Sequence, residues 1–294
     1  MSDRLRDLVA AELDQPVDRR VTAMAASLAA EYLGAARAVL FYGSCLRQRE
    51  LDGLMLDFYL IVSDYRDAYR SKWLVAANSA IPPNVFPFRH DGLIAKYAVL
   101  SEADFARECG LDSSSVSVWA RFAQPSRLVW ASDETARLGA VAAIASAPVT
   151  LFALTRPMMD AGRDDPLAVF RAGFALTYGA ELRAERANRP ESIVDADADR
   201  YARIGEAVLA QGVPDAGARS SAAAWRRRRR WGKALTLIRL AKATTTFTGG
   251  VDYLAWKINR HAGTEIVIRP WQRRWPILGA LTLLPRLWRR GAIR

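Results

Sequence analysis

A single aspartate interrupts an apolar run in the first quarter of the chain. Residues Leu54 to Val62 read as a buried strand, and Asp57 lies inside them. A shorter apolar run, Ala38 to Tyr42, precedes this segment and ends at Gly43-Ser44. Burying a carboxylate without a partner or a metal is expensive, so Asp57 is expected to have one or the other. These residues predict two strands, of which the first ends in a Gly-Ser turn and the second carries a carboxylate.

This arrangement suits phosphate chemistry. The glycine lets backbone N–H groups approach a triphosphate, and the Ser44 hydroxyl adds a donor. Asp57 would hold Mg²⁺ against the phosphates during in-line transfer. The pattern is similar to that of the polymerase-beta-like nucleotidyltransferase fold. Two plainer interpretations stay open: Gly-Ser also occurs at ordinary strand-to-turn junctions, and Asp57 could be hydrogen-bonded for structure alone.

The rest of the chain outlines an α+β protein. Residues 3 to 35 carry helix-period apolar positions and predict two helices, and Leu93 to Leu100 predicts a third strand of a mixed sheet. From Ser101 to Leu209 the pattern is mainly helical, and Gln211 to Pro214 marks a boundary. We therefore expect three parts. They are a nucleotidyltransferase domain (1–105), a mainly helical domain (106–212), and a basic amphipathic C-terminal region (213–294).

Positive charge is concentrated at the C-terminal end. The chain carries a net charge of +11, but residues 225–294 hold 17 Lys and Arg against two acids, a charge of +15, which leaves −4 for the remainder. Six of the nine tryptophans lie in the same segment. Arginine together with tryptophan favours an anionic membrane surface as the partner.

Composition also limits the compartment. Two cysteines, Cys45 and Cys109, do not support a disulfide framework and fit a reducing environment. The N-terminus lacks the apolar segment of a signal peptide, and the apolar stretch Pro276 to Leu284 is far shorter than the roughly 20 residues of a membrane span. A cytoplasmic protein is predicted. Zinc-type Cys/His spacing and a P-loop motif are both absent from the sequence.

A series of short motifs, in the same order as in a known family, extends over residues 38 to 250. The segments Phe41-Tyr42-Gly43-Ser44, Gln48 and Met55-Leu56-Asp57-Phe58 resemble the peripheral phosphatidate cytidylyltransferases of the mitochondrial translocator-maintenance type. The further matching segments are Val62–Asp64, Ile94–Val99, Trp119–Arg127, Leu176–Arg183, Ile193-Val194, Ile238-Arg239, Lys242 and Phe247–Gly250.

The resemblance implies an enzyme that makes CDP-diacylglycerol and pyrophosphate from CTP and phosphatidic acid with Mg²⁺. It also implies a second domain that is helical or winged-helix-like and a membrane-binding C-terminal region. Asp57 would be the metal ligand, and Lys96 would neutralise phosphate charge in the transition state. Gly43, Ser44 and Gln48, with Lys96, would contact the nucleotide. Glu181 and Arg183 would close the site from the second domain, although a local helix ion pair explains them equally well.

Several positions depart from the family pattern. The spacing from Gly43 to Asp57 is shorter, and Glu181 stands where the family has Asp. The second carboxylate usual in the wider fold, two residues after the first, is replaced by Tyr59. Asp52 or Asp64 could supply a second ligand, but neither lies at that strand position.

The C-terminal segment leaves two partners to weigh. Nucleic acid would suit the Arg226–Arg230 run, which would make the chain an RNA nucleotidyltransferase or a binding module. Lipid is favoured by the interfacial Trp/Leu pattern that follows. Its expected membrane contacts are Trp271, Arg273, Arg274, Trp275 and Trp288. The expected location is therefore peripheral, at the inner face of the cell membrane. A helix packed on the protein's own core and a non-catalytic membrane-binding relative remain open.

Overall fold

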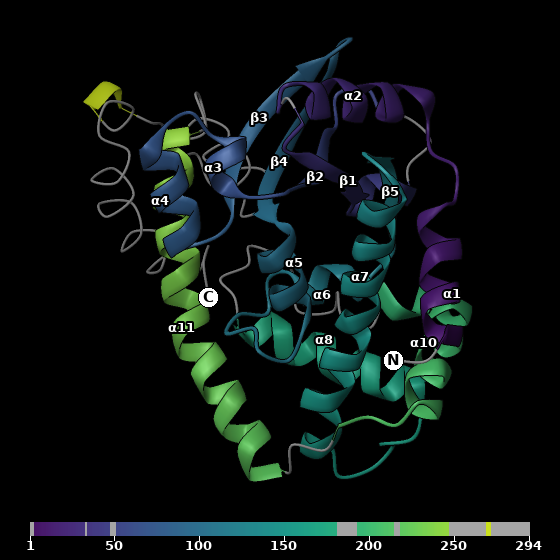
Figure 1. Cartoon of the computed structure of the whole chain (residues 1–294). Coiled ribbons are helices and arrows are strands. Elements are labelled where there is room, and N and C mark those ends of the chain that lie inside the picture. Colours follow the sequence, from purple (N-terminus) through teal and green to yellow (C-terminus); the bar gives the residue numbers. More distant parts are fainter. Residues whose placement is uncertain are drawn as a thin grey trace.

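The computed structural model describes residues 3–32, 34–47, 51–180, 193–214, 218–246 and 269–271. A mixed five-stranded sheet forms one end of the molecule and helices form the other (Figure 1). The strands are β1 (Ala36–Tyr42), β2 (Met55–Val62), β3 (Asn84–His90), β4 (Leu93–Ser101) and β5 (Ser126–Ala131). The α+β class and the mixed sheet predicted from the sequence are confirmed.

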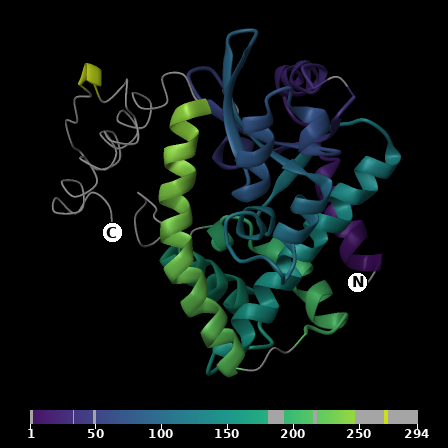
Figure 2. The same ribbon diagram turned by 60° about the vertical axis from the view of Figure 1, so that its left-hand side comes forward.

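The helices follow in chain order among the strands. They are α1 (Asp3–Leu13), α2 (Arg19–Ala30), α3 (Tyr65–Ala68), α4 (Lys72–Ala80), α5 (Glu102–Cys109), α6 (Trp119–Phe122), α7 (Glu134–Thr155), α8 (Pro166–Ala180), α10 (Ala198–Ala210) and α11 (Ala218–Thr246), with 3₁₀ turns η1 (Ser44–Arg47) and η2 (Arg156–Met158). The long α11 runs along one side of the molecule, from α8 to β3 (Figures 1 and 2).

The strand order is β3-β4-β2-β1-β5. β2 and β4 are parallel, while β1–β2, β1–β5 and β3–β4 are antiparallel. In this register Asp57 on β2 lies beside Tyr42 on β1 and beside Lys96 on β4. Strand pairing therefore brings together residues that the sequence separates by tens of positions.

Side-chain alternation along β2 separates two cores. Phe58 and Leu60 pack on the side of α2, with Met24 and Leu28. Tyr59 and Ile61 belong to the larger core, which contains side chains of α1, α5, α7, α8 and α10. Because residues two apart in a strand point to the same face, Asp57 lies on the helical side of the sheet.

β5 corrects one expectation. The sequence predicted a mainly helical pattern from Ser101 onward, but residues 126–131 form an edge strand antiparallel to β1, with Leu128 opposite Leu40. The segment Ser126–Ala131 does not alternate apolar and polar residues, its burial shows no period of two, and its partner lies far away in the sequence. The boundary at residue 105 stays a prediction, although the sheet takes its fifth strand from beyond it.

Helix α7 is the central element of the helical core. With η2 it forms a stretch, Glu134–Met158, that is long and apolar enough to cross a membrane by length and composition. Most of it is buried against the rest of the protein, and Leu151 and Phe152 are fully buried. A core helix passes the same test of length and composition as a membrane span, so α7 is weak support for a span.

A buried ion pair joins the N-terminal helix to the helical part. Glu12 on α1 and Arg200 on α10 are both buried, and Arg200 Nη2 donates to Glu12 Oε1 at 3.1 Å. Arg200 Nη1 also donates to the Ala123 carbonyl oxygen at 2.9 Å, directly after α6. Three distant parts of the chain are therefore fixed relative to one another.

Candidate active site

The turn after β1 requires a glycine. Gly43 has a φ of +95°, a conformation that residues with a side chain rarely adopt. A Cβ at this position would lie 3.2 Å from Asp57 Oδ2. Glycine thus permits both the turn and the close approach of Asp57, and Ser44 begins η1 directly afterwards.

Asp57 faces Lys96 across the parallel pair β2–β4. Lys96 Nζ lies 3.0 Å from Asp57 Oδ1, and the two side chains are 29% and 21% exposed. Oδ1 is buried and makes no hydrogen bond within the described residues, so the ammonium is close enough for an ion pair without the alignment of a hydrogen bond. Asp57 therefore has a charge partner in Lys96, and its Oδ1 can still accept a hydrogen bond or bind a metal ion.

The charge of Asp57 affects the pKa of two neighbouring side chains. Burial, and then the charge of Asp57, raises the pKa of the Cys45 thiol, while a hydrogen bond with Ser44 and the charge of Lys96 act in the opposite direction. Burial, and then Asp57, also raises the pKa of Tyr42 well above its usual value. These effects place the Gly43-Ser44-Cys45 turn and Lys96 at the same carboxylate.

The two carboxylates that could supply a second metal ligand, Asp52 and Asp64, have other hydrogen-bond partners. Asp52 accepts from Arg20 Nη1 at 2.9 Å. Asp64 caps α3 by accepting from the Arg66 backbone N–H at 2.8 Å. Tyr59, at the strand position where the wider fold carries its second carboxylate, is buried against Phe122, with ring centroids 5.1 Å apart.

The described residues contain no group of three or more His, Cys, Asp or Glu side chains arranged to hold a metal ion. Mg²⁺ is commonly held by one or two carboxylates together with substrate phosphates and water. Asp57, with Oδ1 not engaged in a hydrogen bond, fits a Mg²⁺ ion that arrives with a nucleotide. The site does not fit a cage made by the protein alone.

The other predicted site residues have different outcomes. Trp271 is described and is 42% exposed. The remaining ones lie outside the described residues, so their roles stay predictions: Gln48, Glu181, Arg183, Arg273, Arg274, Trp275 and Trp288.

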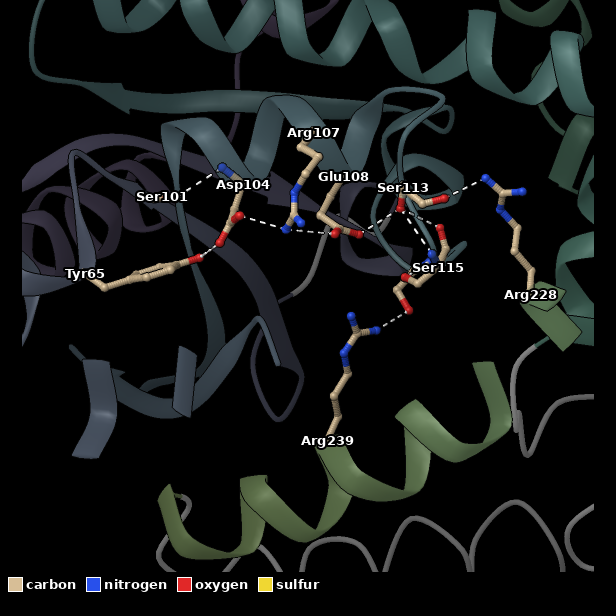
Figure 3. Close-up of polar contacts among 10 residues, drawn as sticks. Tyr65, Ser101, Asp104, Arg107, Glu108, Ser113, Ser115, Arg228 and Arg239 are labelled. Carbon is tan, nitrogen blue, oxygen red and sulfur yellow. Dashed lines mark hydrogen bonds and ion pairs between the residues drawn. The ribbon is translucent and has the colours of Figure 1, made fainter. Parts of the chain in front are cut away.

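The arginine run of α11 is not uniform. Arg226, Arg227, Arg229 and Arg230 are exposed, whereas Arg228 is buried and donates from Nη2 to the Ser113 carbonyl oxygen at 2.6 Å (Figure 3). Arg228 is therefore structural, and only its four neighbours are accessible to a partner.

Two further arginines near the site had no predicted role. Arg121 on α6 hydrogen-bonds to the Tyr42 hydroxyl and donates to the Ser117 carbonyl oxygen. Arg239 on α11 donates from Nη1 to Ser117 Oγ at 2.8 Å (Figure 3). Both arginines lie within motifs that resemble the cytidylyltransferases, but those motifs alone indicate no contact between them.

No family model and no curated protein matches this chain. Among solved structures, it is similar to a nucleotidyltransferase-like protein from Exiguobacterium sibiricum. The two chains share 10% sequence identity, the likeness covers 92% of each, and the TM-score is 0.29. At this level of similarity, the two proteins need not share a reaction.

Proposed function

We propose that the protein is a nucleotidyltransferase, and specifically a phosphatidate cytidylyltransferase. One observation carries the proposal: a glycine turn at the end of β1 touches a partly buried carboxylate on β2, which pairs with Lys96 on β4. An ordinary strand junction has no need of a carboxylate and an ammonium facing the helical side of a sheet. Phosphate chemistry needs both.

The residues divide the work as follows. The Gly43-Ser44 turn binds nucleotide phosphates through backbone N–H groups and a hydroxyl. Lys96 places positive charge where negative charge accumulates on the phosphates in the transition state. Asp57 is the protein ligand for Mg²⁺, and the ion, when bound, neutralises phosphate charge and orients the reacting groups. Tyr59 is buried and Tyr42 is half-buried beside Asp57, and together they limit water on this face of the sheet.

The choice of CTP and phosphatidic acid is supported by the motifs that resemble the cytidylyltransferases. The exposed arginines of α11 and the Trp-rich segment that follows support a peripheral position on an anionic membrane, at the inner face of the cell membrane. The acceptor would be reached there, because phosphatidic acid resides in the bilayer.

Pyrophosphate release tests the proposal. Purified protein is incubated with Mg²⁺, one of the four ribonucleoside triphosphates, and vesicles with or without phosphatidic acid. We expect release with CTP that depends on both phosphatidic acid and Mg²⁺, with a lipid product that carries the cytidylyl group. Equal release from all four nucleotides would overturn the choice of CTP. Release stimulated by RNA instead of phosphatidic acid would indicate an RNA nucleotidyltransferase.

A second candidate is a non-catalytic relative that binds nucleotide at a membrane surface. It is favoured by one observation: Tyr59 occupies the position of the second carboxylate, and both Asp52 and Asp64 have other partners. Such a protein would bind CTP in the presence of Mg²⁺, in equilibrium dialysis, without releasing pyrophosphate under any of these conditions.

A further inference from the structure

Two guanidinium groups from distant parts of the chain meet at one residue. Arg239 on α11 donates to Ser117 Oγ at 2.8 Å, and Arg121 on α6 donates to the carbonyl oxygen of the same residue. Both side chains are partly buried. Figure 3 shows Arg239 extending from α11 toward the loop that precedes α6. Two guanidinium groups bonded to the same residue repel each other, and an anion bound to both relieves the repulsion.

The arginine pair is connected to Asp57 through Tyr42. Arg121 hydrogen-bonds to the Tyr42 hydroxyl, and Tyr42 is the cross-strand neighbour of Asp57 on β1. Lys96 lies on the other side of Asp57, on β4. The carboxylate therefore lies between Lys96 and Tyr42, and the Tyr42 hydroxyl connects it to Arg121 in the helical part.

The two ends of Tyr42 differ in what they contact. At its backbone end the Gly43-Ser44 turn follows directly after β1 and touches Asp57, and the charges of both Asp57 and Lys96 act on the Cys45 thiol of that turn. At its hydroxyl end Tyr42 meets the guanidinium group of Arg121. Backbone N–H groups in a turn suit the bridging phosphates of a nucleotide, whereas guanidinium groups suit a terminal phosphate, which accepts two parallel hydrogen bonds.

In-line nucleotidyl transfer requires this division. The acceptor oxygen approaches the transferred phosphorus from the side opposite the leaving pyrophosphate, so the pyrophosphate and the acceptor phosphate must be held by separate groups. We propose that Arg121 and Arg239 bind the terminal phosphate of the acceptor, a phosphomonoester, while Lys96 and the Gly43-Ser44 turn bind the nucleotide phosphates. This assignment rests on the proposed function and adds to it a subsite built by α6 and α11.

Lys242 strengthens the field at this subsite. It lies one turn after Arg239 on α11, and its ammonium donates to the carbonyl oxygens of Ala77, at 3.3 Å, and of Ile81 at the end of α4. These bonds fix α11 against α4 and thereby hold Arg239 toward Ser117. A cation at the C-terminal end of a helix is also favoured by the helix dipole.

The first test uses the unaltered full-length protein. Inorganic phosphate and glycerol 3-phosphate present a phosphate group without acyl chains. With soluble short-chain phosphatidic acid as the acceptor, we expect both to inhibit competitively against phosphatidic acid and not against CTP. Competition against CTP alone would overturn the assignment, because the arginines would then serve the triphosphate. Inhibition by neither compound would also overturn it, since the phosphate group would not be the part recognised.

The second test changes the arginines. Arg239→Gln is expected to raise the KM for short-chain phosphatidic acid at least about tenfold, as for loss of a charge-assisted hydrogen bond, with a change below about twofold in the KM for CTP. Arg239→Lys keeps the charge without the planar pair of donors, so an intermediate KM is expected. Arg203→Gln, an exposed arginine on α10 that bonds within its own helix, is the matched control.

Calorimetric titration separates failure of the subsite from failure of the proposed function. Short-chain phosphatidic acid is titrated into each folded variant without nucleotide, and CTP with Mg²⁺ is titrated separately. Loss of phosphatidic acid binding in Arg239→Gln, with CTP binding intact, supports the subsite even if no variant turns over CTP. Equal phosphatidic acid affinity in wild type, Arg239→Gln and Arg121→Gln overturns it, whether or not the wild type is an active transferase.

Discussion

Asp57 is subject to one electrostatic and one steric constraint. An aspartate in an apolar strand needs a partner, and Lys96 Nζ lies 3.0 Å from its Oδ1. Gly43 adds the steric constraint, because a side chain there would press on the same carboxylate. The pairing satisfies the charge of Asp57, but it does not consume Oδ1 as a hydrogen-bond acceptor.

We expect Asp57→Asn to fold and to lose turnover by about 100-fold to 1,000-fold. The amide retains the shape but removes the charge that holds Mg²⁺, an effect of several kcal/mol on the transition state. The measurement is kcat for pyrophosphate release, with circular dichroism to check folding. Asp52→Asn is the matched control, since Asp52 pairs with Arg20, and it should remain near wild type. An equal loss in both variants would identify Asp52 as a second ligand, and full activity in Asp57→Asn would remove the proposed metal site.

Lys242 gives a pH-dependent prediction. Burial, and then the charge of Arg239, lowers its pKa from 10.5 to about 8. Between these values the unfolded chain binds the proton more strongly than the folded chain, so this residue makes stability rise with pH across that window. In urea titrations, wild type should gain stability relative to Lys242→Met from about pH 8 to about pH 10, while exposed Lys72→Met should follow wild type. Parallel curves for wild type and Lys242→Met would contradict the shift.

At the scale of elements, α11 has a sharply divided surface. Trp225, Arg228 and Gly232 recur at helical spacing and face inward, and Trp225 Nε1 donates to the Leu154 carbonyl oxygen at 2.9 Å. Trp231 is 61% exposed on the other side. Gly232 is the point of closest approach, because a Cβ there would overlap the Ala180 carbonyl oxygen of α8. The close packing of α11 against α8 therefore depends on a residue with no side chain.

Substituting alanine for two helical glycines should have opposite effects. Gly232→Ala forces α11 and α8 apart and is expected to destabilise the protein by about 1–3 kcal/mol. Gly139→Ala on α7 has nothing within 4 Å of the new methyl group and should stabilise by about 0.5–1 kcal/mol through helix propensity. Chemical denaturation of both variants measures this difference. If Gly232→Ala proved as stable as Gly139→Ala, the close packing of α11 on α8 would be incorrect.

At the scale of the whole molecule, the exposed charge and the proposed acceptor subsite lie on different sides of the same helix. The inner side of α11 carries Arg239 toward Ser117, while four arginines and Trp231 are exposed. A membrane surface bound to the exposed side would lie against the helix that contributes to the proposed subsite. The sequence from Trp271 onward is rich in tryptophan, leucine and arginine, a composition typical of membrane-surface segments.

Two components of lipid binding should be separable. Deleting residues 271–294 should abolish salt-resistant binding to vesicles that contain phosphatidic acid, because apolar insertion is not screened by salt. A variant with Gln at positions 226, 227, 229 and 230 should lose binding chiefly at low salt, since each cation contributes about 1 kcal/mol near such a surface. Arg228 is kept because it is buried.

Vesicle flotation at low and high salt measures both effects. The control replaces four exposed arginines on other elements with Gln, at positions 4, 6, 70 and 203, and should bind as wild type does. Undiminished binding by the truncated protein would contradict the membrane interpretation. Much tighter binding of the full chain to RNA than to anionic vesicles would contradict it as well.

Strong local patterns were sufficient to predict part of this protein from its sequence. The runs that form β1, β2 and β4 are apolar enough to identify, and Asp57 and Gly43-Ser44 are conspicuous because a buried carboxylate and a glycine turn each carry a local energetic demand. The helical spacing of Trp225, Arg228 and Gly232 is also present in the sequence, although a run of five arginines suggests a uniformly solvated surface.

Which distant residues meet depended on the packing of whole elements. β5 joins the sheet through backbone bonds to β1, which depend little on side-chain identity, and Arg121 and Arg239 meet at Ser117 because α6 and α11 pack across the helical core. Many pairings of this kind have similar local energies, and only one arrangement buries both cores together. For that reason the carboxylate could be predicted from the sequence, whereas the meeting of the two arginines at Ser117 could not.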